Sequence, residues 1–201
     1  MGIDFITEKI KQEMREESGK TSASGIASVT ADSGAAYRTA PDAAVSETVN
    51  LNVNGKAYTL QVEPNWPLRD VLRQQLGLTS IKDFCNGYGA CGSCTVIKNG
   101  RPVLSCSVLA VECNGAVIET VEGIAAAEHP IIEAYIMNWT TQCGYCTPGF
   151  VVTAKALLDR NPDPTEEEIK EALSGNLCRC GTYATHVKAV RQAARKLKGK
   201  E

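Results

Sequence analysis

The sequence predicts an α+β fold in which a small sheet domain is followed by an all-helical domain. Three observations lead to this prediction. Apolar residues alternate with polar ones around two Asn–Gly turns between residues 47 and 122. The apolar period becomes helical after residue 122. Eight of the nine cysteines form two groups of four, one in each region. We therefore expect an N-terminal extension (1–46) and two domains, 47–122 and 123–201.

The N-terminal extension shows two patterns. Ile3, Ile6, Ile10 and Met14 have helical spacing, which indicates a short amphipathic helix over residues 3–14. Residues 18–46 are rich in Ser, Ala, Gly and Thr without an apolar period, as is typical of a flexible arm.

The first domain begins with a strong hairpin pattern. Residues 49–53 and 58–62 alternate on either side of Asn54–Gly55, a dipeptide that favours a type I′ turn. Pro67 can start a helix that Gly77 can end. A second Asn–Gly turn joins strands at 95–97 and 102–104, and residues 116–121 predict a further strand. A hairpin, a helix, a cysteine loop and more strands together describe a β-grasp domain.

The second domain is expected to be helical. Thr165 and Glu168 form a capping box for one of its helices, which is expected to end near Gly175. The other expected helices cover residues 130–139, 148–160 and 186–197.

The formal net charge of −2 gives no basic field, so a nucleic-acid partner is not expected. No stretch reaches the roughly 20 apolar residues that span a bilayer, so no membrane role is expected. The N-terminus has no signal-peptide pattern, which predicts a cytoplasmic protein. Cysteine clusters in that compartment are more often metal-binding or catalytic than disulfide-bonded.

The first cysteine tetrad has the spacing C-x5-C-x2-C-x11-C and comprises Cys85, Cys91, Cys94 and Cys106. Three glycines lie among its first three cysteines and would let backbone N–H groups approach cluster sulfur. Four thiolates satisfy a [2Fe–2S] cluster. A zinc site is the alternative, because C-x2-C is also a zinc-binding pattern.

The second tetrad has the spacing C-x2-C-x31-C-x-C and comprises Cys143, Cys146, Cys178 and Cys180. Helices between its two pairs could bring them together at the end of a bundle. Its alternatives are a structural zinc and a redox disulfide. The ninth cysteine, Cys113, is expected to be a buried thiol, with a substitute ligand as the alternative. His129 and His186 are expected to be ordinary structural or surface residues.

Two segments around the second tetrad resemble those of the small iron–sulfur subunits of the xanthine oxidase, or molybdenum hydroxylase, family. They are QCGYCTPGF at residues 142–150 and GNLCRCGTY at residues 175–183. CGSCTV at residues 91–96, followed by Cys106, fits the same family. The family usually has four residues between its first two cysteines, whereas five lie between Cys85 and Cys91.

The resemblance implies a plant-ferredoxin-like β-grasp domain and an all-α four-helix bundle, each carrying one [2Fe–2S] cluster. It implies a large molybdopterin-binding subunit next to the second cluster, with Gln142 and Cys180 at positions that approach the pterin. It also implies a medium FAD-binding subunit facing the first cluster, in a dimer of heterotrimers.

We therefore expect an electron-transfer subunit of an oxidoreductase, with no catalytic residue of its own, whose substrate is converted on a partner chain. The alternatives are a zinc-stapled interaction module and a free-standing ferredoxin-like shuttle.

Overall fold

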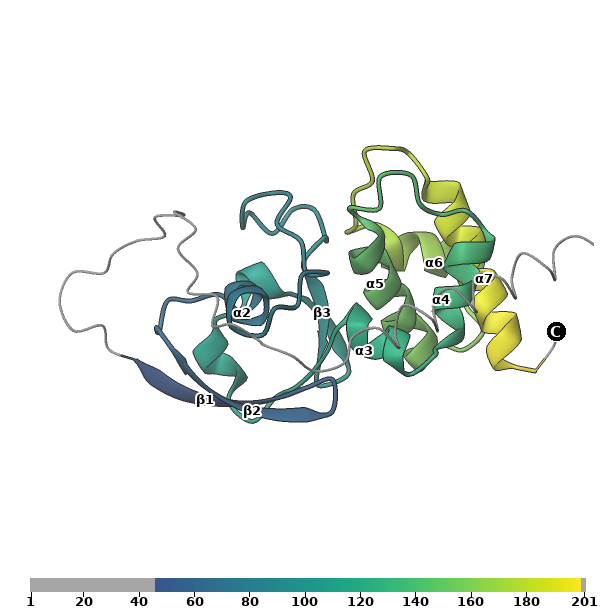
Figure 1. The fold of residues 1–201 in the computed structure, drawn as a ribbon. Coiled ribbons are helices and arrows are strands. Elements are labelled where there is room, and N and C mark those ends of the chain that lie inside the picture. The colour runs from purple at the N-terminus through teal and green to yellow at the C-terminus, as the bar shows by residue number, and fades with distance from the viewer. Residues whose placement is uncertain (1–45, 200–201) are drawn as a thin grey trace, which may run out of the picture. The chain divides into compact units, whose positions relative to one another are not determined.

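The structure is a computed structural model that describes residues 46–199. The expected helix at 3–14 and the arm after it lie outside the described residues. Figure 1 shows a sheet with a short helix across it, followed along the chain by a group of helices.

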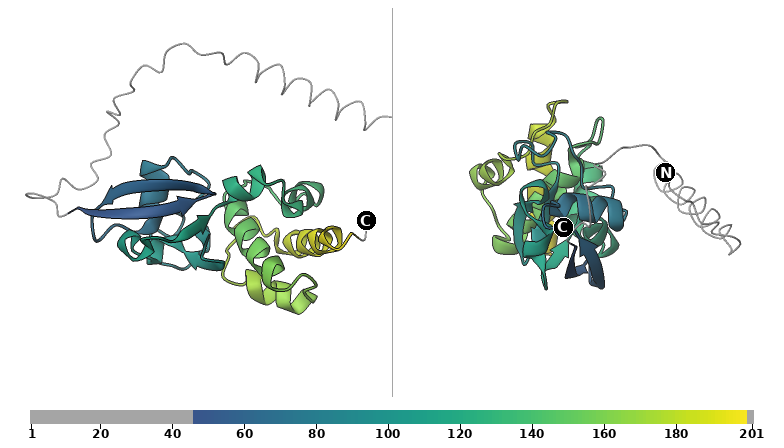
Figure 2. Two further views of the ribbon diagram at one scale, coloured as in Figure 1. Left: turned by 90° about the horizontal axis from the view of Figure 1, so that it is seen from below. Right: turned by 90° about the vertical axis from the view of Figure 1, so that its left-hand side faces the viewer.

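The sheet has five strands in the order β2-β1-β5-β3-β4. Strand β1 pairs antiparallel with β2 and parallel with β5, and β3 pairs antiparallel with both β4 and β5. Figure 2 shows β1 and β2 as a long two-stranded ribbon. The strands are β1 (Glu47–Val53), β2 (Lys56–Val62), β3 (Thr95–Lys98), β4 (Arg101–Leu104) and β5 (Val117–Glu119).

Both predicted Asn–Gly turns are confirmed. Asn54 and Gly55 have φ values of 52° and 80°, and Asn99 and Gly100 have 49° and 76°. Two successive residues with positive φ are what a type I′ turn requires. The turns set the registers Val53↔Lys56 and Lys98↔Arg101.

The strand predicted at 116–121 is shorter than expected and ends at Glu119. The Thr120 amide donates to Asn54 Oδ1 (2.9 Å), and Asn54 Nδ2 donates to the Thr120 hydroxyl (3.0 Å). These side-chain bonds turn the backbone out of the sheet, and helix α3 (Val121–Ala126), which the sequence did not predict, begins at the next residue.

The helix predicted after Pro67 is present as one α-helical turn, α2 (Leu68–Asp70), continued by a π-helical turn at Val71–Gln75. Leu68, Val71 and Leu72 are fully buried against the sheet-domain core. Gly77, with φ of 68°, follows the helical segment. Two short 3₁₀ turns, Ser105–Ser107 and Ala110–Cys113, lie between β4 and β5.

The four predicted helices of the second domain are present with shifted ends. The Thr165–Glu168 capping box is formed in both directions. Helix α7 begins three residues earlier than expected, directly after Thr182. The helices are α4 (Pro130–Met137), α5 (Thr147–Arg160), α6 (Glu166–Leu173) and α7 (Tyr183–Leu197).

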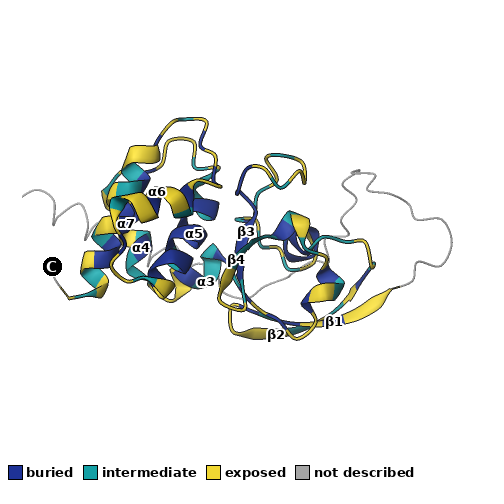
Figure 3. Cartoon of the chain, turned by 180° about the vertical axis from the view of Figure 1, so that it is seen from behind, coloured by how far each residue is buried: buried dark blue, intermediate teal, exposed yellow. Residues whose placement is uncertain are grey.

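Helix α5 is the central element of the helical core. It contacts α4, α6 and α7, and it also packs against β3, so that Ile97 of the sheet is part of the helical core. Figure 3 shows α5 as mostly buried, whereas α6 and α7 have exposed outer faces. Within residues 46–199, none of the helices has the length and apolar character needed to cross a bilayer.

Candidate iron–sulfur centres

The first tetrad lies on a tight loop and on the hairpin that follows it. Positive φ values at Asn86, Gly87, Gly89 and Gly92 curl the loop. Cys94 directly precedes β3, and Cys106 follows β4 by two residues. Because Thr95 pairs with Leu104, the hairpin brings these two cysteines side by side.

The electrostatics of the first tetrad link its thiols in two pairs, Cys85 with Cys91 and Cys94 with Cys106. Burial tends to raise the pKa of Cys85, but hydrogen bonds from the backbone N–H of Ala90 and from Cys91 outweigh it, and the pKa is lowered. Burial, followed by the influence of Cys106, raises the pKa of Cys94 to about 12. A curled loop with N–H groups directed at sulfur is suited to hold a thiolate.

A buried cation, Arg69, lies beside this loop. No pattern in the sequence indicated it. Arg69 has a side chain only 8% exposed and forms ion pairs of 2.7 Å with Asp70 and with Asp83. Burial opposes its charge, but the two carboxylates and the Cys106 sulfur raise the pKa of Arg69. No sequence signal marks Arg69, because it sits in a helix that reads as an ordinary amphipathic segment.

The second tetrad is assembled from the segments that precede α5 and α7. Cys146 is the residue before α5, and Cys143 lies three residues earlier in the same loop. Cys178 and Cys180 lie in the connection between α6 and α7. Burial tends to raise the pKa of Cys178, but hydrogen bonds from the Thr182 hydroxyl and from backbone N–H groups lower it to about 7.

The thiols of this tetrad interact with one another across the two segments. The pKa of Cys143 is lowered by the Tyr145 backbone and by Cys180. Burial and the neighbouring Cys178 raise the pKa of Cys146 to about 12. The structure therefore brings together two cysteine pairs that the sequence separates by 31 residues.

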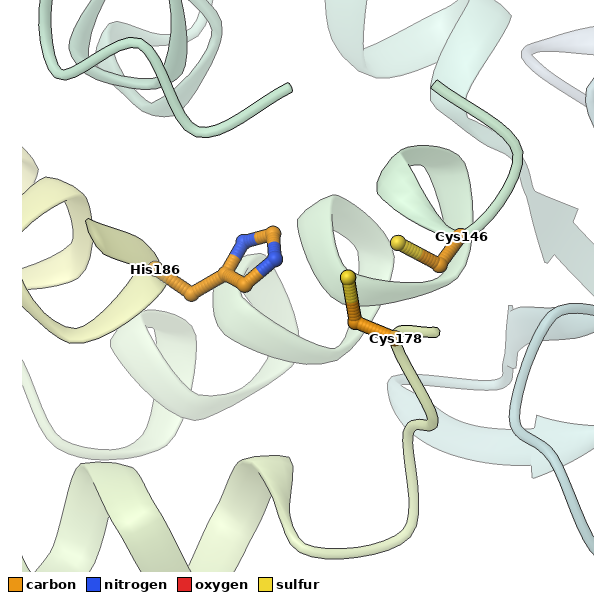
Figure 4. Close-up of side chains that lie close together, drawn as sticks. All are labelled: Cys146, Cys178 and His186. Atoms are coloured by element: carbon orange, nitrogen blue, oxygen red, sulfur yellow. The ribbon is translucent and has the colours of Figure 1, made fainter. Parts of the chain in front are cut away.

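His186 lies next to the second tetrad, although the sequence analysis treated it as an ordinary residue. One of its ring nitrogens and the Sγ atoms of Cys146 and Cys178 lie within 4.8 Å of one another. Figure 4 shows the imidazole extending from α7 toward the two sulfurs. Burial alone lowers the pKa of His186 to about 4. The four-residue spacing from Thr182, directly before α7, to His186 is one helical turn and is the signal that could have revealed this arrangement.

The two tetrads are connected through backbone and side-chain contacts. The Leu177 amide, one residue before Cys178, donates to the carbonyl of Cys91 (2.9 Å). Asn176 Nδ2 donates to the carbonyl of Gly92 (3.0 Å). The Tyr145 hydroxyl donates to the carbonyl of Asp83 (3.1 Å). Each contact joins a residue within two positions of one tetrad to a residue within two positions of the other.

Gln142 and Cys113 complete the set of residues selected from the sequence. Gln142 is exposed in the loop between α4 and α5. Cys113 is fully buried in the sheet-domain core, and its thiol donates weakly to the carbonyl of Leu109 (3.5 Å). Burial raises the pKa of Cys113. These properties confirm the expectation of a buried thiol.

The donor sets fit [2Fe–2S] clusters. All nine cysteines fall within the described residues and are free thiols. Those of the second tetrad interact as a group of four, and those of the first interact as two pairs on one loop and the hairpin after it. Four thiolates are the ligand number that each cluster needs. The N–H and O–H groups directed at Cys85 and Cys178 supply the hydrogen bonds that stabilise thiolate ligands.

Comparison with known proteins agrees with this geometry. Residues 51–117 match the family model described as a 2Fe-2S iron-sulfur cluster binding domain, and residues 120–191 match the model described as a [2Fe-2S] binding domain. The chain is therefore an iron–sulfur protein with two cluster-binding domains, a ferredoxin-like domain followed by a helical one.

Individual relatives indicate which kind of two-cluster iron–sulfur protein this chain resembles. The chain is 51% identical over 148 residues to the nicotinate dehydrogenase small FeS subunit of Eubacterium barkeri, covering 73% of this chain and 94% of that protein. It is 39% identical over 167 residues to the aldehyde oxidoreductase iron-sulfur-binding subunit of Escherichia coli, covering 75% and 72%.

Solved structures show the same relationship. Quinoline 2-oxidoreductase from Pseudomonas putida matches with a TM-score of 0.71 and 38% identity, covering 78% of this chain and 99% of that one. The aldehyde oxidoreductase from Desulfovibrio desulfuricans matches with a TM-score of 0.74 and 46% identity, covering 77% of this chain and 18% of that much longer one. The chain belongs to the iron–sulfur subunits of the xanthine oxidase family.

Proposed function

We propose that this chain carries two [2Fe–2S] clusters and relays electrons between a molybdopterin centre on a large subunit and a flavin subunit. The observation that carries the proposal is that eight free thiols lie in two hydrogen-bonded regions, as two interacting pairs in the first and as a group of four in the second. The proposed ligands are Cys85, Cys91, Cys94 and Cys106 for the first cluster, and Cys143, Cys146, Cys178 and Cys180 for the second.

When bound, the two clusters would supply one-electron transfer between the two partner cofactors. The residues of this chain hold and tune those sites. Backbone N–H groups of the 85–94 loop face the first tetrad, and the guanidinium of Arg69 places a fixed positive charge near Cys106. The hydrogen bond from the Leu177 amide to the Cys91 carbonyl provides a short bonded route between the tetrads.

The relatives named as subunits support the presence of larger partner chains. We infer a large molybdopterin-binding subunit next to the second tetrad, with Gln142 and Cys180 near the pterin. The exposure of Gln142 on the loop that carries Cys143 supports this inference. We also infer a medium FAD-binding subunit and a dimer of heterotrimers, as the family resemblance implies.

The domain organisation is part of the proposal. We place the boundary near residue 122, with an extension over 1–46 and domains over 47–122 and 123–201. Family matches at 51–117 and 120–191 support this division. Contacts among α4, α5, α6 and α7 support a four-helix bundle for the second domain. We propose a cytoplasmic location, in keeping with nine free thiols.

Metal and sulfide analysis of the purified complex tests the proposal. We expect about four iron and about four acid-labile sulfide per copy of this chain, with visible absorption that dithionite bleaches. Colourless protein containing zinc would favour the zinc-stapled interaction module instead. An iron-containing chain that purifies alone, without a molybdopterin subunit, would favour a free-standing ferredoxin-like shuttle.

A further inference from the structure

His186 is held rigidly in the helical core beside the second tetrad. It is fully buried, and its ring stacks on Phe150 with a centroid distance of 4.0 Å and an interplanar angle of 1°. Tyr135 packs on it at 5.4 Å and 45°. Because both neighbours are buried, the plane of the imidazole is fixed.

A chain of two hydrogen bonds joins this ring to a cysteine of the tetrad. His186 Nε2 lies 3.1 Å from the Thr182 hydroxyl oxygen. The same oxygen lies 3.2 Å from Cys178 Sγ. Thr182 is the residue that precedes α7, and His186 lies one helical turn after it. Cys178 lies four residues before Thr182, in the connection from α6, so that connection and the first turn of α7 together present the chain of contacts.

The direction of these hydrogen bonds follows from the other ring nitrogen. His186 Nδ1 is buried and has no hydrogen-bond partner among residues 46–199. A neutral imidazole carries one hydrogen, and placing it on Nδ1 would bury a donor with nothing to accept it. An unpaired buried acceptor is tolerated better than an unpaired N–H group. The hydrogen therefore belongs on Nε2, where it is donated to the Thr182 oxygen.

This tautomer also orients the hydroxyl. The Thr182 oxygen accepts from His186, so its single hydrogen is available for the sulfur, and an iron-bound thiolate can only accept. We propose that His186 is a positioning residue for the second cluster: its Nε2–H directs the Thr182 hydroxyl to donate to the Cys178 sulfur. This inference rests on the proposed function, since it requires a cluster on the second tetrad.

A hydrogen bond to a thiolate ligand stabilises the reduced cluster more than the oxidised one, because the reduced cluster carries more negative charge. The His186–Thr182 pair should therefore raise the reduction potential of the second cluster and leave that of the first unchanged. The first cluster serves as an internal reference in the same chain.

The experiment is a redox titration of the full-length chain in its purified complex, monitored by electron paramagnetic resonance. Iron content is measured for every variant. Thr182→Val should lower the reduced-to-oxidised ratio of the second cluster about tenfold at fixed potential. This corresponds to a fall in its reduction potential of about 59 mV for one electron. Thr182→Ser keeps the hydroxyl and should behave as wild type. His186→Leu should shift the ratio in the same direction by about threefold, and His186→Gln, which retains an N–H donor, should shift it less.

The double variant separates a positioning role from a merely structural one. Because His186 acts through Thr182, adding His186→Leu to Thr182→Val should change the potential no further than Thr182→Val alone. Three outcomes would each overturn the proposal. They are additive shifts of the reduction potential in the double variant, an unchanged potential in His186→Leu, and nitrogen coupling that shows direct iron–imidazole ligation. If Thr182→Val loses the second cluster, the reduction potentials of His186→Leu and His186→Gln test the proposal in its place.

Failure of the proposed function would look different. If the wild-type complex contained only about two iron atoms per chain and gave a single cluster signal, the proposed two-cluster function itself would be contradicted before any variant is compared.

Discussion

Gly149 at the start of α5 lies directly against the carbonyl oxygen of Gly92 in the first cysteine loop, so that a Cβ on Gly149 would overlap that oxygen. The amide of Asn176 donates to the same carbonyl, and a Cβ on Gly92 would in turn collide with Asn176. Gly149 has ordinary helical backbone angles, so close approach, not conformation, requires glycine there. This contact holds the two cysteine loops together.

Gly149→Ala should therefore destabilise the protein. The neighbouring atom is backbone and cannot move aside like a side chain, so we expect a loss of about 1–3 kcal/mol. The free energy of unfolding is measured by urea denaturation, followed through both circular dichroism and visible absorbance. Gly175→Ala is the matched control, because a Cβ there meets nothing within 4 Å and its φ is not positive. Equal stability of the two variants would contradict this prediction.

Cysteine substitution tests the assignment of the ligands. Cys178→Ser should reduce the iron content from about four to about two atoms per chain, because the second cluster loses one of its four thiolates. Cys113→Ser provides the control, since Cys113 is equally a buried cysteine but lies in the sheet-domain core. It should retain all the iron at some cost in stability. Loss of iron in Cys113→Ser together with full retention in Cys178→Ser would reverse the assignment.

Arg69→Met should destabilise the first domain. The substitution preserves much of the apolar stem but leaves the buried carboxylate of Asp70 and the partly buried one of Asp83 without their cation. Removing one partner of a buried ion pair costs about 3–5 kcal/mol. Thermal unfolding followed at the absorption band of the cluster measures the effect. Arg101→Met, at an exposed position of β4, should change the midpoint little. A stable Arg69→Met protein would show that the ion pair is not needed.

Glu122 should stabilise the fold in a pH-dependent manner. Burial tends to raise the pKa of Glu122, but hydrogen bonds from Ser80 (2.6 Å) and Thr120 (2.5 Å) outweigh it and lower the pKa. A carboxylate with a folded-state pKa below its unfolded value stabilises the protein above the unfolded pKa of about 4.3, and that stabilisation is lost as the pH falls through the folded pKa.

Glu122→Gln should consequently cost about 1 kcal/mol at pH 7. The difference from wild type should stay constant from about pH 8 to pH 5 and shrink below about pH 4. Urea unfolding, monitored by tryptophan fluorescence, measures this difference in the free energy of unfolding. Glu112→Gln, at an exposed position, should differ from wild type by less than about 0.5 kcal/mol throughout. A difference that grows as the pH falls would contradict the assigned direction of the pKa shift.

The elements predicted from the sequence were those governed by local interactions. The two Asn–Gly hairpins, the helix after Pro67 and the capping box at Thr165 are all present, because turn residues, apolar period and caps act over only a few residues. The ends that were predicted wrongly depend on distant partners. Strand β5 ends early because Asn54, 66 positions before Thr120, binds both the amide and the hydroxyl of that residue.

The sequence by itself predicted which cysteines make up the two tetrads, since spacing and flanking motifs are properties of the chain. Only the tertiary structure decided what surrounds those thiols: Arg69 beside the first tetrad, His186 behind the second, and the Gly92–Gly149 contact between their loops. The reason is physical. Each of these environments is created by packing segments from separate parts of the chain, and no local pattern records which buried side chain will lie next to which sulfur.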